Sequence, residues 1–373
     1  MDTRLAPVHP EVVDEPGQHT FLNSTTCRLV QKRRPRDCGT ASPKWPSTGK
    51  PPTIPGCTAR LRGSFNALAF GRASGYAARV KFQKIAILGV GLLGGSIGLA
   101  VKKHGLADEV AGFVRRPASL ADCERAGALD YATTDLLAAV SRADLVILCT
   151  PLAQMAAITT QFLPALKPGA VVTDVGSVKA SVVRGLAARV ARAGGHFVGS
   201  HPMAGAEKTG VLAARADLLV NAVCVVTPTK RSHAPAVRVL ENFWRALGMR
   251  TLLLSPAEHD VLVSRTSHLP HVVAAALASR VLTPQRPAAQ AALCASGFRD
   301  TTRVASGSPE MWRDIALANH KNLARAVKAF IGDLEQFQAA LTRGDEVAVT
   351  RFFETAKQRR DAWCAGGGTL SPE

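Results

Sequence analysis

The apolar positions of the chain follow two different patterns, which meet near Ser255. Between residues 82 and 254, short runs of consecutive apolar residues alternate with longer stretches in which apolar residues recur every three or four positions. The short runs are typical of strands buried on both faces, and the longer stretches are typical of helices. Their repeated alternation predicts an α/β fold with a doubly wound, mainly parallel sheet.

Strands are expected at residues 85–88, 109–114, 144–150, 170–174, 196–199, 221–227 and 250–254. Beyond Ser255 the strand signals end, and helical patterns rich in Ala, Leu and Val continue to about Trp363. These patterns predict one domain at residues 81–254 and an all-helical domain at residues 255–365. The second domain has long apolar helices and few aromatic residues to fill a core, so we expect it to form a homodimer.

Residues 1–80 differ from the rest of the chain, because they are rich in Pro, Arg, Thr and Ser and lack sustained periodicity. One interpretation is a targeting peptide. However, the acidic residues near the N-terminus do not suit a transit peptide, and no apolar core suits a secretory signal. The favoured interpretation is a disordered extension, or translated sequence upstream of the true start.

The strand expected at residues 85–88 leads directly into a glycine-rich loop, Gly89-Val90-Gly91-Leu92-Leu93-Gly94, and then into a helical pattern. A strand, a tight turn and a helix in this order place a dinucleotide pyrophosphate on a helix N-terminus. The first glycine allows the turn, the second lets backbone approach phosphate, and the third lets helix and strand pack closely. We expect a cofactor site made of Gly89, Gly91, Leu92, Leu93, Gly94 and Thr150. The alternative is a purely structural turn.

The end of the second expected strand bears on the choice of cofactor. In an NAD-binding unit, an acidic residue about 20 positions past the glycines binds the ribose 2′-hydroxyl. Arg115 and Arg116 stand at that place in this chain. Since an arginine there can pair with a 2′-phosphate, we expect NADP in preference to NAD. The alternative is a pair of solvated surface arginines.

Composition narrows the classes of function. The net charge of +18 suggests nucleic acid, but no recognition motif accompanies it. A phosphorylated cofactor and an anionic substrate explain a positive cleft equally well. The eight cysteines show no metal-like spacing, which favours a reducing compartment. No apolar run approaches the roughly 20 residues that span a bilayer. We therefore expect a soluble, cytoplasmic protein without a metal, a nucleic-acid partner or a membrane partner.

Polar residues follow two of the expected strands, at the edge where open α/β sheets bind ligands. One loop carries Asp174, Ser177 and Lys179, and the other carries His201, Met203, Glu207 and Lys208. A histidine at such a place can accept a proton from a substrate hydroxyl near neutral pH. As a lone residue it could equally be a structural capping histidine.

The helical region contains two further clusters. His268 and His271 are three residues apart on one helical face, but no carboxylate is spaced to complete a metal site with them. Arg299 and Arg303 are four apart, so they share a face and could clamp an anion. A solvated basic helix face is the alternative for these arginines.

Five motifs, in this order, resemble the prephenate/arogenate dehydrogenase family of tyrosine biosynthesis: GVGLLGGSIGLA, DVGSVK, HPMAGAEKTG, SHLPH and GFRDTTRVASGSPEMW. The resemblance covers residues 82–363. It implies a Rossmann domain followed by a helical dimerisation domain. It also implies oxidative decarboxylation of prephenate or arogenate with hydride transfer to NAD(P)⁺, giving 4-hydroxyphenylpyruvate or tyrosine.

The same resemblance implies roles for individual residues. His201 is similar to the family histidine that accepts the proton of the substrate's C4 hydroxyl. Ser177 is similar to the family serine that orients this histidine and the hydroxyl. The other matching positions belong to the substrate pocket: Arg303 at a carboxylate, Glu207 as a gating acid, Trp312 shaping the site, and His271 and Arg299 at further positions. The family often has lysine where Arg299 stands.

Two other functions stay open. One is a two-domain NADP-dependent oxidoreductase of the β-hydroxyacid dehydrogenase type, which uses a helix-borne lysine as its base, whereas the polar groups here centre on His201. The other is a nucleotide-sensing or nucleic-acid-binding protein, which would leave Ser177, His201 and Arg303 unexplained. Within the resembled family, prephenate and arogenate are both open as substrates, because no residue is identified that reads their keto or amino group.

Overall fold

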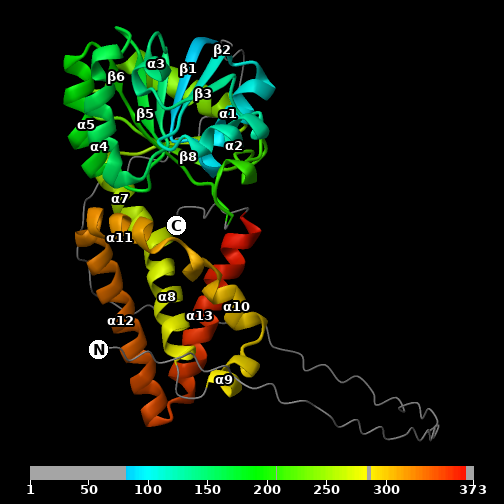
Figure 1. Cartoon of the computed structure of the whole chain (residues 1–373). Coiled ribbons are helices and arrows are strands. Elements are labelled where there is room, and N and C mark those ends of the chain that lie inside the picture. The colour runs from blue at the N-terminus through cyan, green and yellow to red at the C-terminus, as the bar shows by residue number, and fades with distance from the viewer. Residues whose placement is uncertain (1–80, 207, 284–286, 367–373) are drawn as a thin grey trace, which may run out of the picture. The chain divides into compact units, whose positions relative to one another are not determined.

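The computed structural model describes residues 81–206, 208–283 and 287–366 (Figure 1). The extension expected at residues 1–80 and the candidate gating acid Glu207 lie outside the described residues. The described chain lies in one compact unit. Strands and helices alternate up to β9 (Arg250–Leu253), and the chain is helical from α7 (Pro256–Val263) onwards.

The first part is built on a six-stranded sheet in which every neighbouring pair of strands is parallel. The strand order β3-β2-β1-β4-β5-β6 reverses its direction between β1 and β4. Open sheets of this kind bind ligands at such a reversal, outside the carboxyl ends of the strands. The predicted fold class is therefore confirmed. The strands are β1 (Phe82–Leu88), β2 (Ala107–Phe113), β3 (Tyr131–Thr133), β4 (Leu145–Leu148), β5 (Val171–Asp174) and β6 (His196–Phe197).

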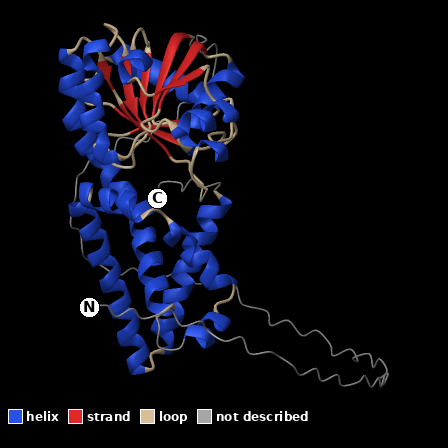
Figure 2. Ribbon diagram, in the orientation of Figure 1, coloured by secondary structure: helices blue, strands red, loops and turns tan. Residues whose placement is uncertain are grey.

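Helices pack on both faces of this sheet (Figure 2). Ile85 and Ile87 of β1 belong to one core with side chains of α1 and α6, and Ala86 and Leu88 belong to the other core with side chains of α3, α4 and α5. None of these four side chains is exposed. Full burial of an isoleucine or leucine stabilises a fold by about 1.5–3 kcal/mol, so the alternation along β1 holds both helical layers. The helices are α1 (Leu92–His104), α2 (Ala118–Ala126), α3 (Leu136–Val140), α4 (Met155–Phe162), α5 (Ala180–Arg192) and α6 (Ala234–Ala246), with short turns η1 (Leu152–Gln154), η2 (Leu163–Ala165) and η3 (Val211–Ala213).

A second sheet of three strands contains β7 (Gly199–Pro202), β8 (Val223–Thr227) and β9, with β7 antiparallel to β8 and β8 parallel to β9. The sequence pattern predicted one strand at residues 196–199 with His201 in the loop after it, which is wrong. The chain instead leaves the first sheet at Val198, whose N–H donates to the Val172 carbonyl at 2.9 Å. Gly199 already pairs with Thr227 of β8, so His201 lies within a strand.

From Ser255 to residue 366 the described chain is helical, which confirms the predicted helical part. Ser255 begins α7 as an N-cap, since its hydroxyl accepts the Glu258 N–H at 3.2 Å. A π-helical turn at Ser264–His268 joins α7 to the next helix. No helix among the described residues is long and apolar enough to cross a membrane. The remaining elements are α8 (Leu269–Val281), α9 (Pro287–Leu293), α10 (Ser296–Thr302), η5 (Arg303–Ser306), α11 (Pro309–Ala318), α12 (His320–Arg343) and α13 (Glu346–Ala365).

Candidate active site

The glycine loop lies beside the carboxyl ends of three strands. Gly89 donates its N–H to the Phe113 carbonyl at 3.0 Å, and Cys149 donates to the Leu88 carbonyl at 2.7 Å. The φ angle of Gly89 is 97°, a conformation that favours glycine. A Cβ on Gly94 would lie 2.3 Å from the Gly89 carbonyl oxygen. The turn therefore requires Gly89, and the close packing of α1 requires Gly94.

The N-terminus of α1 fits the pyrophosphate of a dinucleotide. Gly91 is its N-cap, no side chain caps the helix, and its first turn, which begins with Leu92 and Leu93, contains no acidic residue. A Cβ on Gly91 would meet nothing within 4 Å, so backbone is open to a ligand there. The Thr150 hydroxyl is buried without a hydrogen-bond partner in the described structure, and Thr150 packs against Gly89. Helix N-terminal N–H groups and a buried unpaired hydroxyl are features that bind phosphate and ribose oxygens.

Arg115 and Arg116 come two and three residues after the end of β2 and are both exposed. The last residue of β2, Phe113, accepts the Gly89 N–H, so the two arginines stand next to the start of the glycine loop. The Val114 N–H donates to the Thr133 carbonyl at 3.0 Å, which fixes the backbone in front of them. The arginines are thus close to the part of the site where a dinucleotide ribose is bound in folds of this class.

Asp174 and Lys179, which the sequence placed among the polar candidates of one loop, form a fully buried ion pair. The Lys179 ammonium also donates to the Ser200 carbonyl at 2.7 Å. Burial lowers the pKa of Lys179, and the charge of Asp174 opposes this effect. Because Ser200 precedes His201 in β7, the pair holds the backbone behind His201. Its role is to support the site, and neither side chain faces solvent.

His201 is buried, with 7% of its surface exposed, and pairs with Val225 across β7 and β8. Burial lowers the pKa of His201 well below 6.5, and the electrostatic interactions with His259, Lys179 and His268 lower it further. The imidazole is therefore neutral at pH 7 and can accept a proton. Its Nδ1 lies 2.9 Å from His259 Nε2, which leaves Nε2 of His201 for a ligand.

Two residues of this site were not singled out from the sequence, His259 and Asp260 of α7. His259 Nδ1 lies 2.8 Å from Asp260 Oδ1, so the two residues continue the hydrogen-bonded series that starts at His201. A signal for them exists in the segment PAEHDVLV, where His259, Asp260 and Val263 form the buried face of the helix. Two adjacent titratable residues on the buried face of a helix need partners inside the protein, and such partners indicate a functional cluster.

His271 and Trp312 form a second cluster with Arg303. The His271 and Trp312 rings are stacked, with centroids 3.7 Å apart, and His271 Nδ1 lies 2.9 Å from the Ser267 carbonyl. Burial lowers the pKa of His271, and the positive charge of Arg303 contributes to the same effect. The structure therefore brings together three of the residues that the sequence assigned to a substrate pocket.

His268 connects the two clusters. It is fully buried, and its ring lies edge-on to Trp312 with centroids 6.1 Å apart. Burial lowers the pKa of His268 to about 4, and the nearby backbone of Ser177 acts in the opposite direction. Ser177 itself is half-buried in the loop between β5 and α5. The loop of Ser177, the histidines of β7 and α7, and the Trp312 cluster therefore belong to one region of the molecule.

Arg299 and Arg303 are both exposed, the first on α10 and the second at the start of η5. Both elements pack against α8, the helix that carries His271. The two arginines thus stand on one segment beside the His271 cluster.

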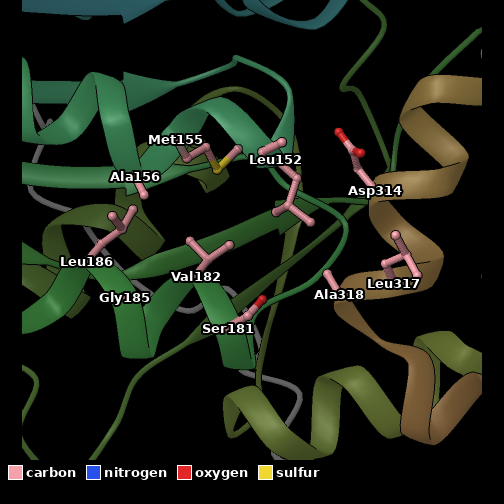
Figure 3. A pocket seen from close by; sticks show the side chains of 11 residues that line it. Leu152, Met155, Ala156, Ser181, Val182, Gly185, Leu186, Asp314, Leu317 and Ala318 are labelled. Carbon is pink, nitrogen blue, oxygen red and sulfur yellow. The ribbon is translucent and has the colours of Figure 1, made fainter.

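None of these polar groups lines an apolar pocket of about 310 Å³ (Figure 3). Its lining comes from η1 and α4, from α5 and from α11, and includes Leu152, Met155, Val182 and Leu317. Asp314 is the one titratable side chain of the lining, and it pairs with Arg313 at 2.8 Å. Apart from this ion-paired carboxylate, the pocket offers mainly apolar surface.

Two family models match the chain over most of its described length. A model of the nucleotide-binding domain of prephenate dehydrogenase matches residues 97–253, and a model of the dimerization domain of prephenate dehydrogenase matches residues 255–357. The border between the two matches coincides with the change from the sheets to the all-helical part.

Comparison of the chain with individual proteins indicates the same family. The chain is 34% identical to the prephenate dehydrogenase of Bacillus subtilis over 74% of this chain and 75% of that protein. It is also 34% identical to the cyclohexadienyl dehydrogenase of Zymomonas mobilis, over 75% of this chain and 95% of that one. A crystal structure of prephenate dehydrogenase from Aquifex aeolicus, in complex with hydroxyphenyl propionate and NAD⁺, superposes with a TM-score of 0.69 at 31% identity and covers 75% of this chain and 98% of that chain.

Proposed function

The chain belongs to the prephenate dehydrogenase family, and on this premise we propose that it oxidises and decarboxylates prephenate or arogenate with a nicotinamide dinucleotide. The observation that carries the proposal is His201, a buried, neutral histidine with one ring nitrogen held by His259 and the other left for a substrate hydroxyl. Lys179 is fully buried in an ion pair and presents no surface to a substrate, which disfavours a mechanism with Lys179 as the base.

The dinucleotide would be held by Gly89, Gly91, Leu92, Leu93, Gly94 and Thr150. The open backbone at Gly91 and the unpaired Thr150 hydroxyl support this assignment. When bound, the nicotinamide supplies the acceptor for the hydride that leaves C4 of the substrate ring.

His201 is the base of the proposed reaction. Its Nε2 takes the proton of the C4 hydroxyl while the electron pair of the C4–H bond leaves as hydride. The ring carboxylate then departs as carbon dioxide, its electron pair restores the aromatic ring, and the proton returns from His201 to the ring oxygen. Ser177, in the loop beside His268, would orient the hydroxyl and the histidine. The reaction needs one base and a means of holding carboxylates, and both fit the side chains present.

The substrate pocket would be formed on the side of α8. Arg303 would bind a carboxylate, His271 and Arg299 would supply further polar contacts, and Trp312 would set the shape of the pocket. The stacking of His271 on Trp312 and the proximity of Arg303 to His271 support these roles. Glu207 is assigned to the pocket from the sequence motif alone, because it lies outside the described residues.

A steady-state assay of prephenate and arogenate, each with NAD⁺ and NADP⁺, tests the proposal. We expect reduced nicotinamide to accumulate with at least one of the four pairs, together with one carbon dioxide per turnover. The pair with the highest kcat/KM identifies the physiological combination. Absence of nicotinamide reduction with all four pairs, in a folded protein, would contradict the proposal.

We further propose that NADP is the preferred dinucleotide. The support is the pair of exposed arginines next to the glycine loop, where an arginine can bind a 2′-phosphate through two hydrogen bonds. For Arg115→Asp we expect kcat/KM with NADP⁺ to fall by about 100-fold, with little change for NAD⁺, because a charge-assisted hydrogen bond contributes about 1.5–3 kcal/mol. Arg192→Asp, at the exposed end of α5, is the charge-matched control. Equal losses with the two cofactors would show that Arg115 does not read the 2′ position.

We also propose that the chain forms a homodimer through its helical part. Large apolar side chains are exposed on α12 and α13, among them Ile331, Leu334, Leu341, Phe352, Phe353 and Trp363. Apolar surface gathered on two long helices is typical of a protein interface. Multi-angle light scattering should therefore give twice the chain mass of 39.3 kDa. A monomer at micromolar concentration would contradict the dimer.

A further inference from the structure

Three buried side chains from two elements form one hydrogen-bonded series. Asp260 Oδ1 lies 2.8 Å from His259 Nδ1, and His259 Nε2 lies 2.9 Å from His201 Nδ1. The exposed fractions of Asp260, His259 and His201 are 3%, 0% and 7%. Water therefore has little access to the nitrogen atoms between them, and each of these atoms depends on its protein partner.

The direction of the series is determined at Asp260. Its Oδ1 accepts the Lys179 N–H at 2.7 Å, and its Oδ2 accepts the Ala180 N–H at 2.9 Å. Backbone N–H groups can only donate, so both oxygens of Asp260 act as acceptors. His259 Nδ1 must then carry the hydrogen, and burial lowers the pKa of His259, which favours its neutral form with Nε2 as an acceptor.

The hydrogen positions of His259 also determine the tautomer of His201. Because His259 Nε2 accepts, His201 Nδ1 must donate, and the lone pair of a neutral His201 then lies on Nε2. The opposite arrangement would set His259 Nδ1 and Asp260 Oδ1 against each other as two acceptors. It would leave a buried polar pair unsatisfied, at a cost of about 1–3 kcal/mol.

We propose that His259 and Asp260 are positioning residues that hold His201 in its Nδ1–H tautomer, with Nε2 presented to the substrate hydroxyl as the base. This inference rests on the proposed function of His201. After the proton is transferred, the His201 imidazolium still donates to His259, and the carboxylate of Asp260 stabilises the charge through His259. The other titratable groups around the series are the ion pair of Lys179 with Asp174 and the buried His268.

Asp260 also joins this series to the rest of the site. The two N–H groups that it binds come two and three residues after Ser177, at the beginning of α5. The Asn319 side chain, between α11 and α12, donates to the Asp260 carbonyl at 2.7 Å. One side chain therefore sets the tautomer of His201 and the position of the loop that carries Ser177.

The first test is a direct reading of the tautomer. The full-length protein, labelled with ¹⁵N in its histidine rings, is measured by NMR at pH 8, and the His201 signals are identified by their loss in His201→Asn. We expect the hydrogen of His201 on Nδ1 and the hydrogen of His259 on Nδ1. A His201 ring with its hydrogen on Nε2 would overturn the inference, whether or not His201 is the base.

The second test is a matched pair of substitutions at His259. His259→Asn retains a donor near Asp260 but loses the acceptor for His201, whereas the amide oxygen of His259→Gln can still reach His201 Nδ1. We expect His259→Asn to lower kcat by about 100-fold, with KM for substrate and cofactor nearly unchanged, and His259→Gln to recover most of this loss. The exposed His104→Asn at the end of α1 is the control and should retain full activity.

The outcomes of the second test separate the inference from the proposed function. Equal kcat values for His259→Asn and the unmodified protein would overturn the inference while His201 stays the base. Near-normal turnover of His201→Asn would instead refute the proposed function. If the His259 variants do not fold, the tautomer measured in the unmodified protein decides.

Discussion

Replacement of His201 by asparagine is expected to lower kcat by about 1,000-fold, the range in which a positioned general base contributes. Asparagine can occupy the place of the imidazole and donate to His259, but it cannot accept a proton at neutral pH. The glycine loop is unchanged, so the dissociation constant of the cofactor should be retained. Steady-state kinetics and fluorescence titration with the reduced cofactor measure the two quantities separately.

The pH profile provides an independent check on His201. Burial and the electrostatic interactions with neighbouring groups lower the pKa of His201 well below 6.5, so the neutral, basic form persists to lower pH than in an exposed histidine. The acid limb of kcat/KM should therefore lie below pH 6.5 and be absent in His201→Asn. A limb at or above pH 6.5, or near-normal turnover of the variant, would show that another group is the base.

Replacement of Arg303 by alanine is expected to raise KM for the substrate by about 100-fold with a small change in kcat. A guanidinium–carboxylate pair contributes about 1.5–3 kcal/mol, and this contribution is nearly the same in the ground state and the transition state. Arg303→Lys should recover part of the affinity, because lysine retains the charge but not the two parallel donors. Initial rates over a wide range of substrate concentration separate KM from kcat.

Arg299→Ala is the matched control for this prediction. Arg299 and Arg303 are both exposed and lie on neighbouring elements that pack against α8. Of the two, Arg303 is the one that interacts electrostatically with His271. We therefore expect the larger rise in KM for Arg303→Ala. A larger effect at Arg299, or a loss confined to kcat, would contradict the assignment of Arg303 to a substrate carboxylate.

The strand, glycine loop and first helix could be predicted from the sequence because their signals are local. The apolar run of β1 is buried on both faces, and Gly94 is packed against Gly89 and Ile87 of the same short segment. The change at Ser255 from alternating strands and helices to helices alone also has a local signal, because a capping serine and a new periodicity mark it. The motifs around His201 and Arg303 added roles that periodicity alone cannot supply.

Other features depend on contacts between residues far apart in the chain. The exit from the first sheet at Val198 is decided by which strand accepts each hydrogen bond, and a pattern of apolar residues carries no such information. His201 and His259 are 58 positions apart, so their contact exists only after α7 packs on β7. The burial of Lys179 likewise follows from Asp174 and the Ser200 carbonyl, because an unpaired lysine would stay in water.

The glycine loop and the end of β2 differ sharply in how much mutation they tolerate. Any side chain at Gly94 would have to displace the Gly89 carbonyl, which would lie 2.3 Å from its Cβ, so this position is closed to change. Arg115 and Arg116 are exposed at the end of a strand, and substitutions there disturb no core. On the roles proposed for these residues, holding a dinucleotide and choosing between two dinucleotides are separable traits. We therefore expect one or two codon changes at the end of β2 to switch cofactor use during evolution or engineering, while the loop proposed to bind the pyrophosphate is inherited intact.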